Sequence, residues 1–205
     1  IYEEGSLAVL KGNLAPDGCV IKPAACDKKF LKHKGPALVF NSYPEMKEII
    51  DRDDLDVTEN HVLVLRNVGP VGGPGMPEWG MMPIPKKLLK KGVRDMVRIS
   101  DARMSGTSYG ACILHVAPES YVGGPLSLLE TGDIIEINVD LRSINMLVDE
   151  KTLLQRKKKV KKNNPKAGRG WLWMYSNHVR QANEGCDFDF LESDFGISAK
   201  EPDIF

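Results

Sequence analysis

The chain has 205 residues, with 28 Lys plus Arg against 28 Asp plus Glu, so its formal net charge is zero. This balance excludes a strong general attraction to nucleic acid or to an anionic membrane surface, and no apolar run approaches the roughly 20 residues that span a bilayer. A chain of this length can bury a substantial core. We therefore expect a cytoplasmic protein with one main domain that binds neither nucleic acid nor membrane.

The spacing of the cysteines and the identity of the first residue indicate the redox compartment and the processing of the protein. Cys19, Cys26, Cys112 and Cys186 lie far apart and form no C-x-x-C pair, which favours reduced cytosolic thiols over a disulfide framework. The chain begins at Ile1 with no methionine and no signal-like segment. Such a start fits a processed product or a cut piece of a longer protein.

Strands dominate the first two thirds of the chain. Short apolar or alternating runs are separated there by clusters of Gly, Pro, Asn and Asp, the pattern expected of strands and turns. The predicted strands are residues 7–10, 19–22, 37–40, 61–65, 96–99, 112–116 and 134–139.

Two helices are expected between these strands. Ser42 with Glu45 three residues later has the spacing of a capping box, which predicts a helix over 44–52. The pattern of residues 80–91 predicts a second helix, with Leu88 and Leu89 buried. Many strands with few helices predict a mixed, strand-rich α/β fold, a barrel or sandwich with peripheral helices.

The last third begins with a basic run, QRKKKVKKNNPKAGRG, at 155–170. Without interleaved aromatic residues or a net basic domain, such a run is typical of a solvated helix end that leads into a linker, although it could also grip phosphate. Hydrophobic spacing from Trp171 to Val179 then predicts an amphipathic helix docked on the body or on a further domain. We expect a main domain over 1–154, a basic linker over 155–170, and a C-terminal helix with an acidic tail over 171–205.

The most informative loop is ISDARMSGTSYG, residues 99–110. It places the hydroxyls of Ser105 and Thr107 on a glycine-flanked turn directly after an apolar run, and Gly106 allows a ligand to approach the backbone. A serine hydroxyl needs a neighbouring base or metal to become reactive. Asp101 and Arg103 are expected to pair and shape the loop, with direct substrate contact as the alternative.

A second loop, GPVGGPG at 69–75, leads to Glu78. It lacks the Gly-Lys-Ser/Thr of a P-loop and the spacing of a dinucleotide fingerprint. A carboxylate held by a rigid Gly/Pro turn suits a hard cation such as Mg²⁺. Alternatively, Glu78 complements the dipole of the helix that runs through Leu88.

Other polar residues have two interpretations each. His178, on the predicted C-terminal helix, either contacts substrate or is a hydrogen-bonded structural histidine. His115 lies between two apolar residues and is expected to belong to a strand. Asp187 and Asp189 resemble a metal cluster but also fit a solvated chain end.

Several long motifs resemble the C-terminal portion of the IlvD/Edd dehydratase family. They are GPVGGPGMPE, ISDARMSGTSYG, HVAPES followed by VGGP, and LLETGDIIEINV, with LKGNLAPDGCVIK near the start and HVRQANEGCDFDFL near the end. The similarity runs from about Leu7 to Leu191. That family includes dihydroxy-acid dehydratase, phosphogluconate dehydratase and the sugar-acid dehydratases, and its C-terminal domain is a swivelling β/β/α barrel-like domain resembling that of aconitase.

The resemblance implies a hydro-lyase that removes water from a 2,3-dihydroxy acid to give a 2-keto-3-deoxy acid, with an iron-sulfur cluster and Mg²⁺. It makes Ser105 the base that takes the C2 proton as an alkoxide, Glu78 a Mg²⁺ ligand, and Thr107 a hydrogen-bonding partner of the substrate. A cation near the substrate carboxylate would spread the enolate charge and lower the cost of a serine alkoxide.

The resemblance also implies a missing part. The family's cluster cysteines and remaining Mg²⁺ ligands lie in an N-terminal domain, and none of the four cysteines here matches a cluster position. We expect this chain alone to bind no cluster and turn over no substrate, and we expect the full protein to form the homo-oligomer that is the family habit.

Within the family, ARMSGTS replaces the GRFSGG common in branched-chain members. Together with the closing HVRQANEGCDFDFL, this resembles the arabinonate and xylonate dehydratases, and a hydroxyl at Thr107 suits a polyhydroxylated substrate. We predict a pentonate as substrate. The alternatives are dihydroxy-acid dehydratase or phosphogluconate dehydratase activity and, outside enzymes, a sugar-acid binding module or a structural or regulatory domain.

Overall fold

The computed structural model describes residues 6–106, 109–160, 163 and 167–191. Its α-helices are α1 (Tyr43–Ile49), α2 (Lys86–Lys90), α3 (Glu150–Lys159) and α4 (Gly170–His178). Its strands are β1 (Ala8–Gly12), β2 (Ala15–Ile21), β3 (Lys32–Phe40), β4 (Val62–Leu65), β5 (Arg98–Ser100), β6 (Cys112–Ala117), β7 (Ile134–Asn138) and β8 (Ser143–Met146). Single 3₁₀ turns lie at Pro23–Ala25, Lys28–Phe30, Ser120–Val122, Pro125–Leu128, Ala182–Glu184 and Asp189–Leu191.

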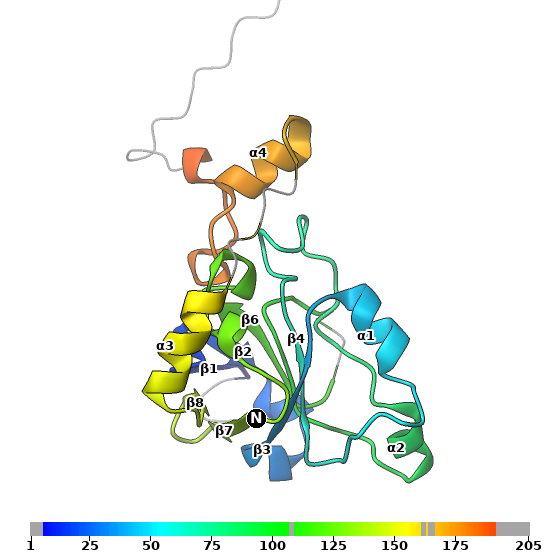
Figure 1. Cartoon of the computed structure of the whole chain (residues 1–205). Helices are drawn as coiled ribbons and strands as arrows, with labels where there is room; N and C mark the ends of the chain where they lie inside the picture. Colours follow the sequence, from blue (N-terminus) through cyan, green and yellow to red (C-terminus); the bar gives the residue numbers. More distant parts are fainter. Residues whose placement is uncertain (1–5, 107–108, 161–162, 164–166, 192–205) are drawn as a thin grey trace, which may run out of the picture.

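The strands close into a mixed barrel in the order β1-β2-β6-β5-β4-β3-β7-β8 (Figure 1). Strands β3, β4, β5 and β6 run parallel to one another. Strands β2 and β7, on either side of this parallel group, pair with it in the antiparallel sense. The predicted strand-rich α/β barrel is therefore confirmed, and every predicted strand overlaps an observed one.

Side chains that alternate along the strands fill two separate cores. In β4, Val62 and Val64 join the core inside the barrel, whereas Leu63 and Leu65 join a second core under the peripheral helices. Successive strand residues point to opposite faces, so a strand covered on both faces is apolar throughout. This explains why β4 reads VLVL, with all four residues buried.

The two helices α1 and α2 lie on one side of the barrel, and α3 lies on the other (Figure 1). Ser42 caps α1 by accepting a hydrogen bond from the Glu45 amide, as the capping-box spacing predicts. The Glu45 carboxylate, however, accepts from the Asn41 amide. The helix predicted over 80–91 is wrong in extent, because residues 80–85 contain two prolines and only Lys86–Lys90 is helical.

The helix α3 runs across the expected domain boundary at residue 154. Asp149 caps α3 and the helix continues to Lys159, so the basic run 155–170 begins as helix. Arg156, the second residue of that run, pairs with Asp133 of the barrel domain at 2.5 Å. The helix is thereby tied to the body by one of its basic residues.

The helix α4 stands away from the barrel (Figure 1), and none of its residues is buried. Trp171 is 82% exposed, whereas Tyr175 on the same helix interacts with the backbone of Gly75 in the body. The chain that follows, from the buried Val179 onward, makes further contacts with the body. Among the described residues, no helix is long and apolar enough to cross a membrane.

Candidate functional site

Three loops leave the barrel at one edge because they follow the neighbouring parallel strands β4, β5 and β6. Ligand sites of α/β proteins characteristically lie beyond the carboxyl ends of parallel strands. The loop after β4 contains the Gly-rich stretch 69–75 and Glu78, and the loop after β5 contains Ser105. The loop after β6 contains Glu119 and Ser120. The topology therefore gathers the predicted loops at one place.

A buried carboxylate, Asp101, joins all three loops. It is 0% exposed and accepts hydrogen bonds from the amides of Asn67 and Val68, at 3.3 and 3.1 Å. It also accepts from the amide and hydroxyl of Ser120, at 2.9 and 2.5 Å. Burial raises the pKa of Asp101, and these hydrogen bonds oppose the shift. The strand ends are thus fixed by a polar hub.

A second buried carboxylate, Glu119, holds the Gly-rich loop. Its two oxygens accept from the amides of Val71 and Gly72, at 2.8 and 2.9 Å. Gln181, from the segment after α4, donates to the same carboxylate at 3.0 Å. Burial raises the pKa of Glu119 as well.

The loops of Glu78 and Ser105 are joined by Arg103. Its guanidinium donates to the Glu78 carboxylate at 3.0 Å and to the carbonyl of Met76 at 2.6 Å. The carbonyl of Arg103 in turn accepts from the amide of Gly80 at 2.7 Å. A Cβ at Gly80 would lie 2.7 Å from that carbonyl, so the close approach requires glycine. Glu78 is thereby held against the serine loop by Arg103, which lies two residues before Ser105.

Ser105 is half-buried. The ammonium group of Lys22, at the end of β2, donates to the carbonyl of Gly106 at 2.8 Å and so brings a positive charge to the serine loop. A Cβ built on Gly106 meets no atom of the described part of the chain within 4 Å, which leaves this side of the loop open. Thr107 lies outside the described residues.

His178, the last residue of α4, is oriented by Asp189. Its Nδ1 lies 2.8 Å from a carboxylate oxygen of Asp189. The rings of Trp173 and Phe190 meet the imidazole edge to face, with centroids at 6.0 and 5.3 Å. An isolated bridge between Val179 and Phe188 folds the chain back so that these groups meet. His178 is therefore hydrogen-bonded through Nδ1, and no hydrogen bond of its Nε2 is seen within the part of the chain that the structure describes.

The C-terminal segment meets the same edge as the three loops. Besides the Gln181 contact, the thiol of Cys186 lies 3.3 Å from the sulfur of Met76, two residues before Glu78. Tyr175 of α4 also interacts with the backbone of Gly75. The structure thus joins the Glu78 loop to the Ser105 loop on one side and to the His178 segment on the other.

Two expectations are wrong. Asp101 and Arg103 do not pair, because Asp101 points inward to backbone amides and Arg103 points outward to Glu78. Glu78 does not complement a helix dipole, because α2 begins only at Lys86. His115 does lie in a strand, β6, as expected.

Sequence reasoning assigned no role to Lys22, Glu119 or Gln181. All three lie in motifs that carry the family resemblance, LKGNLAPDGCVIK, HVAPES and HVRQANEGCDFDFL. Acidic residues are rarely fully buried without partners. The position of Glu119, directly after a run of apolar strand residues, therefore indicated a carboxylate that is buried and hydrogen-bonded. Its partners, however, lie 47 or more positions away.

The cysteines do not fit an iron-sulfur cluster. All four are free, and Cys19 and Cys112 are buried. Burial raises the pKa of Cys19 to about 12 and those of Cys26 and Cys112 to about 11, whereas a cluster is held by thiolates. Among the described residues, no group of three or more His, Cys, Asp or Glu side chains gathers as a metal site.

Glu78 fits a single ligand of a hard cation. It is a half-exposed carboxylate on a loop fixed through Arg103, and Mg²⁺ is commonly bound through one or two protein carboxylates. The remaining ligands would have to come from outside the residues described here. Arg103 and such a cation would compete for the same carboxylate.

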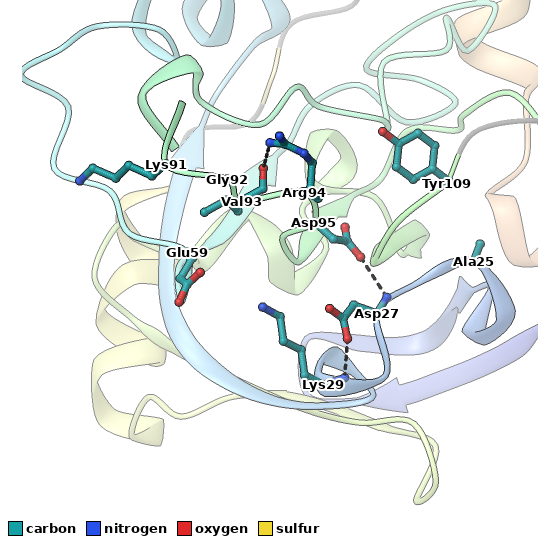
Figure 2. A pocket seen from close by; sticks show the side chains of 10 residues that line it. All are labelled: Ala25, Asp27, Lys29, Glu59, Lys91, Gly92, Val93, Arg94, Asp95 and Tyr109. Atoms are coloured by element: carbon teal, nitrogen blue, oxygen red, sulfur yellow. Dashed lines mark hydrogen bonds between the residues drawn. The ribbon is translucent and has the colours of Figure 1, made fainter. Parts of the chain in front are cut away.

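The opposite, amino-terminal edge of the parallel strands carries a hollow of about 450 Å³ (Figure 2). Part of its polar lining is engaged: Asp95 accepts from the amide of Asp27 and forms a buried ion pair with Arg98 at 2.7 Å. Arg94 donates to nearby carbonyls. Charges of both signs line the hollow, with Glu59 and Lys91 among them.

The chain is similar over most of its length to members of one protein family. Residues 1–186 match the family described as dihydroxy-acid/6-phosphogluconate dehydratase, C-terminal. The chain is 53% identical over 203 residues to a 6-deoxy-6-sulfo-D-gluconate dehydratase of Pseudomonas putida, covering 98% of this chain and 35% of that protein. It is 46% identical over 192 residues to an L-arabinonate dehydratase of Rhizobium leguminosarum, covering 94% and 33%.

A branched-chain relative is more distant. The chain is 42% identical over 187 residues to a dihydroxy-acid dehydratase of Methanococcus aeolicus, covering 91% of this chain and 33% of that protein. In each case the chain spans about a third of the relative's length.

Proposed function

Because this chain belongs to the dihydroxy-acid/6-phosphogluconate dehydratase family, as its C-terminal domain, we propose that it is the C-terminal third of a sugar-acid dehydratase. The reaction removes water from a 2,3-dihydroxy sugar acid and yields a 2-keto-3-deoxy acid. The observation that carries the proposal is the junction of the Ser105 and Glu78 loops through Arg103, at the carboxyl ends of the parallel strands.

Ser105 takes the proton from C2 of the substrate. No atom of the described residues lies within 4 Å of a Cβ built on Gly106, and the loop carries the positive charge of Lys22. A nearby positive charge stabilises an alkoxide. Thr107 and His178 hydrogen-bond the substrate, and Asp189 orients His178 for this contact.

Two groups that this chain does not hold by itself belong to the proposal. Glu78 is one ligand of Mg²⁺, which when bound polarises the substrate carboxylate and spreads the charge that develops on loss of the C2 proton. The iron-sulfur cluster does not fit the cysteines of this chain, so we assign it to the preceding domain of the same protein. That domain and a second copy of the protein are the proposed partners, in the cytoplasm.

The favoured substrate is a pentonate, as in the L-arabinonate dehydratase relative. A six-carbon sugar acid with a terminal sulfonate is the second candidate, because the 6-deoxy-6-sulfo-D-gluconate dehydratase shares 53% of its matched residues with this chain. Turnover of L-arabinonate, 6-deoxy-6-sulfogluconate and a branched-chain dihydroxy acid by the full-length protein ranks these possibilities.

Ser105→Ala tests the proposed base. In the full-length protein the substitution is expected to lower kcat by about 10⁴-fold or more, and to abolish exchange of the C2 hydrogen with solvent deuterium, because no other group takes that proton. Ser143→Ala, in β8 on another part of the barrel, is the matched control and should keep both activities. Turnover near that of the wild type in Ser105→Ala would refute the enzyme proposal in favour of a binding or structural domain.

A further inference from the structure

Glu119 and Gln181 form a reciprocal pair between the end of β6 and the C-terminal segment. The amide of Glu119 donates to the Gln181 side-chain oxygen at 2.8 Å, and the Gln181 side-chain nitrogen donates back to the Glu119 carboxylate at 3.0 Å. Glu119 is 0% exposed. Because the same carboxylate also accepts from Val71 and Gly72, one side chain joins its own segment to two others.

The fit around this carboxylate is close. A Cβ at Gly69 would lie 2.6 Å from an oxygen of Glu119, so the carboxylate occupies the space that a side chain at residue 69 would fill. A Cβ at Gly72 would lie 2.6 Å from the carbonyl of Asn67. The glycines of this loop therefore let its backbone amides reach the buried oxygens.

The segments joined by Glu119 carry two of the proposed site residues. The Gly-rich loop continues to Glu78, and Gln181 follows His178 by three positions. Gln181 is itself fixed, since its amide donates to Glu184 in a capping box. A change in the Glu119 pair would shift both Glu78 and His178.

We propose that Glu119, with Gln181, is a positioning residue that holds the Glu78 loop and the His178 segment as one unit. This inference rests on the proposed function in one respect, that Glu78 and His178 act in the same site. The joint itself, by which we mean the hydrogen-bonded contact of Glu119 with Gln181 and the Gly-rich loop, rests on the geometry alone.

The chemistry of the joint favours positioning over simple stabilisation. Burying a carboxylate away from water costs free energy unless hydrogen bonds replace the lost hydration, and an apolar side chain avoids that cost. What an apolar side chain lacks is the ability to accept from two successive amides and an amide side chain at once. A carboxylate at residue 119 therefore fixes the geometry of three segments that apolar packing would leave free to slide.

Hydrogen exchange in the full-length protein tests the joint. Gln181→Leu keeps the size of the side chain but removes its hydrogen bonds to Glu119. We expect amide exchange to speed up by about tenfold or more in peptides covering 179–188 and also in those covering 67–76, because the variant loses two hydrogen bonds and each is worth about 1 kcal/mol. Peptides from β4 and β7 should be unchanged. Gln155→Leu, on the exposed face of α3, is the matched control and should alter neither peptide.

Steady-state kinetics give the readout that a purely structural contact would not move. We expect Gln181→Leu to lower kcat by about tenfold while the KM for the sugar acid changes much less, because displaced reacting groups slow the chemical step. Measured per folded molecule, a merely stabilising contact would leave kcat at its wild-type value.

Exchanging the two side chains provides a rescue. Gln181→Glu alone places two carboxylates face to face, and kcat should fall further than in Gln181→Leu. Adding Glu119→Gln restores one carboxylate opposite one amide, and most of the lost kcat should return. If Glu119→Gln alone fails to fold, the single Gln181 variants still decide the question.

The outcomes separate this inference from the proposed function. Unchanged exchange in 67–76 in Gln181→Leu, or an unchanged kcat, overturns the positioning role even if Ser105→Ala is inactive. Coupled exchange with an active Ser105→Ala variant would instead support the joint and refute the proposed reaction.

Discussion

The two ends of the parallel strands solve the same problem in different ways. At the amino ends, the largely buried Asp95 is paired with the buried cation of Arg98 and also accepts from the amides of Asp27, Met96 and Ala111. At the carboxyl ends, buried Asp101 and Glu119 are held by backbone amides, a hydroxyl and an amide side chain. The carboxylate at the amino ends is neutralised by a cation, whereas those at the carboxyl ends are held by neutral donors.

Both ends hold loops through a carboxylate, and the groups beside those loops indicate which end is built for a ligand. At the amino ends, beside the hollow in Figure 2, the charge of Asp95 is neutralised by Arg98. A carboxylate that gathers amides from several loops fixes those loops relative to one another, which is the requirement of a preorganised site. The exposed Arg103 and Glu78 lie beside these fixed loops, where a substrate can reach them.

The largest expected effect is at the hub of the carboxyl ends. Asp101→Ala removes the acceptor of the Val68 and Ser120 amides, and one of the two acceptors of the Asn67 amide and of the Ser120 hydroxyl. It should therefore lower the free energy of unfolding of this chain by about 4 kcal/mol. A urea titration followed by circular dichroism measures this loss.

The exposed Asp17 of β2 supplies the control, and Asp17→Asn should leave the urea midpoint unchanged. A loss below about 1 kcal/mol in Asp101→Ala would show that the amides find other partners, and the contrast between the two ends would disappear.

A slightly smaller loss is expected at the amino ends. Arg98→Met removes the cation of a buried pair and should cost about 3 kcal/mol, because the Asp95 carboxylate then stays buried without its counter-charge. The same urea titration measures it, with the exposed Arg52→Met as control.

Hydrogen exchange in Arg98→Met tests whether the two ends of the parallel strands are independent of each other. If the two ends are independent, exchange in 67–76 should remain at the wild-type rate in Arg98→Met. Faster exchange there would mean that the strands transmit the change and that the amino ends also position the loops.

The smallest effect is on the pH dependence of stability. Burial raises the pKa of Asp101 above its ordinary value of 3.8, so the folded chain binds this proton more tightly than the unfolded chain does. Its contribution to the free energy of unfolding therefore falls as the pH rises above 3.8. Asp101→Asn should remove this fall, changing the slope by at most about 1.4 kcal/mol per pH unit.

The measurement is urea unfolding at a series of pH values, with Asp17→Asn as the exposed control. Because Glu119 also has a raised pKa, some of the fall should persist in Asp101→Asn. A wild-type slope identical to that of the variant would mean that Asp101 ionises in the folded state as easily as in the unfolded state.

The elements of the barrel were predictable to the extent that their signals are local. Apolar runs bounded by turn residues located seven strands, and Ser42 located the start of α1. The strand β8, with the sequence SINM, escaped prediction because it is short and only half apolar. Its place is set by antiparallel pairing with β7, which no local pattern encodes.

The candidate site was predictable in part. The motifs marked Ser105 and Glu78, and the structure joins their loops through Arg103. The predicted Asp101–Arg103 pair was wrong because neighbours along an irregular loop need not point the same way.

Local chemistry along the chain decided where strands and turns form and which loops carry reactive groups, since both depend on residues close in sequence. Folding alone decided that Asp101 meets amides 33 and 34 positions away and that Glu119 meets Gln181 across 62 positions. Such partners are selected by barrel closure and by the burial of polar groups that must then be satisfied. A hydrogen bond between distant residues leaves no periodic trace in a single sequence, so the hubs that hold the site became visible only in three dimensions.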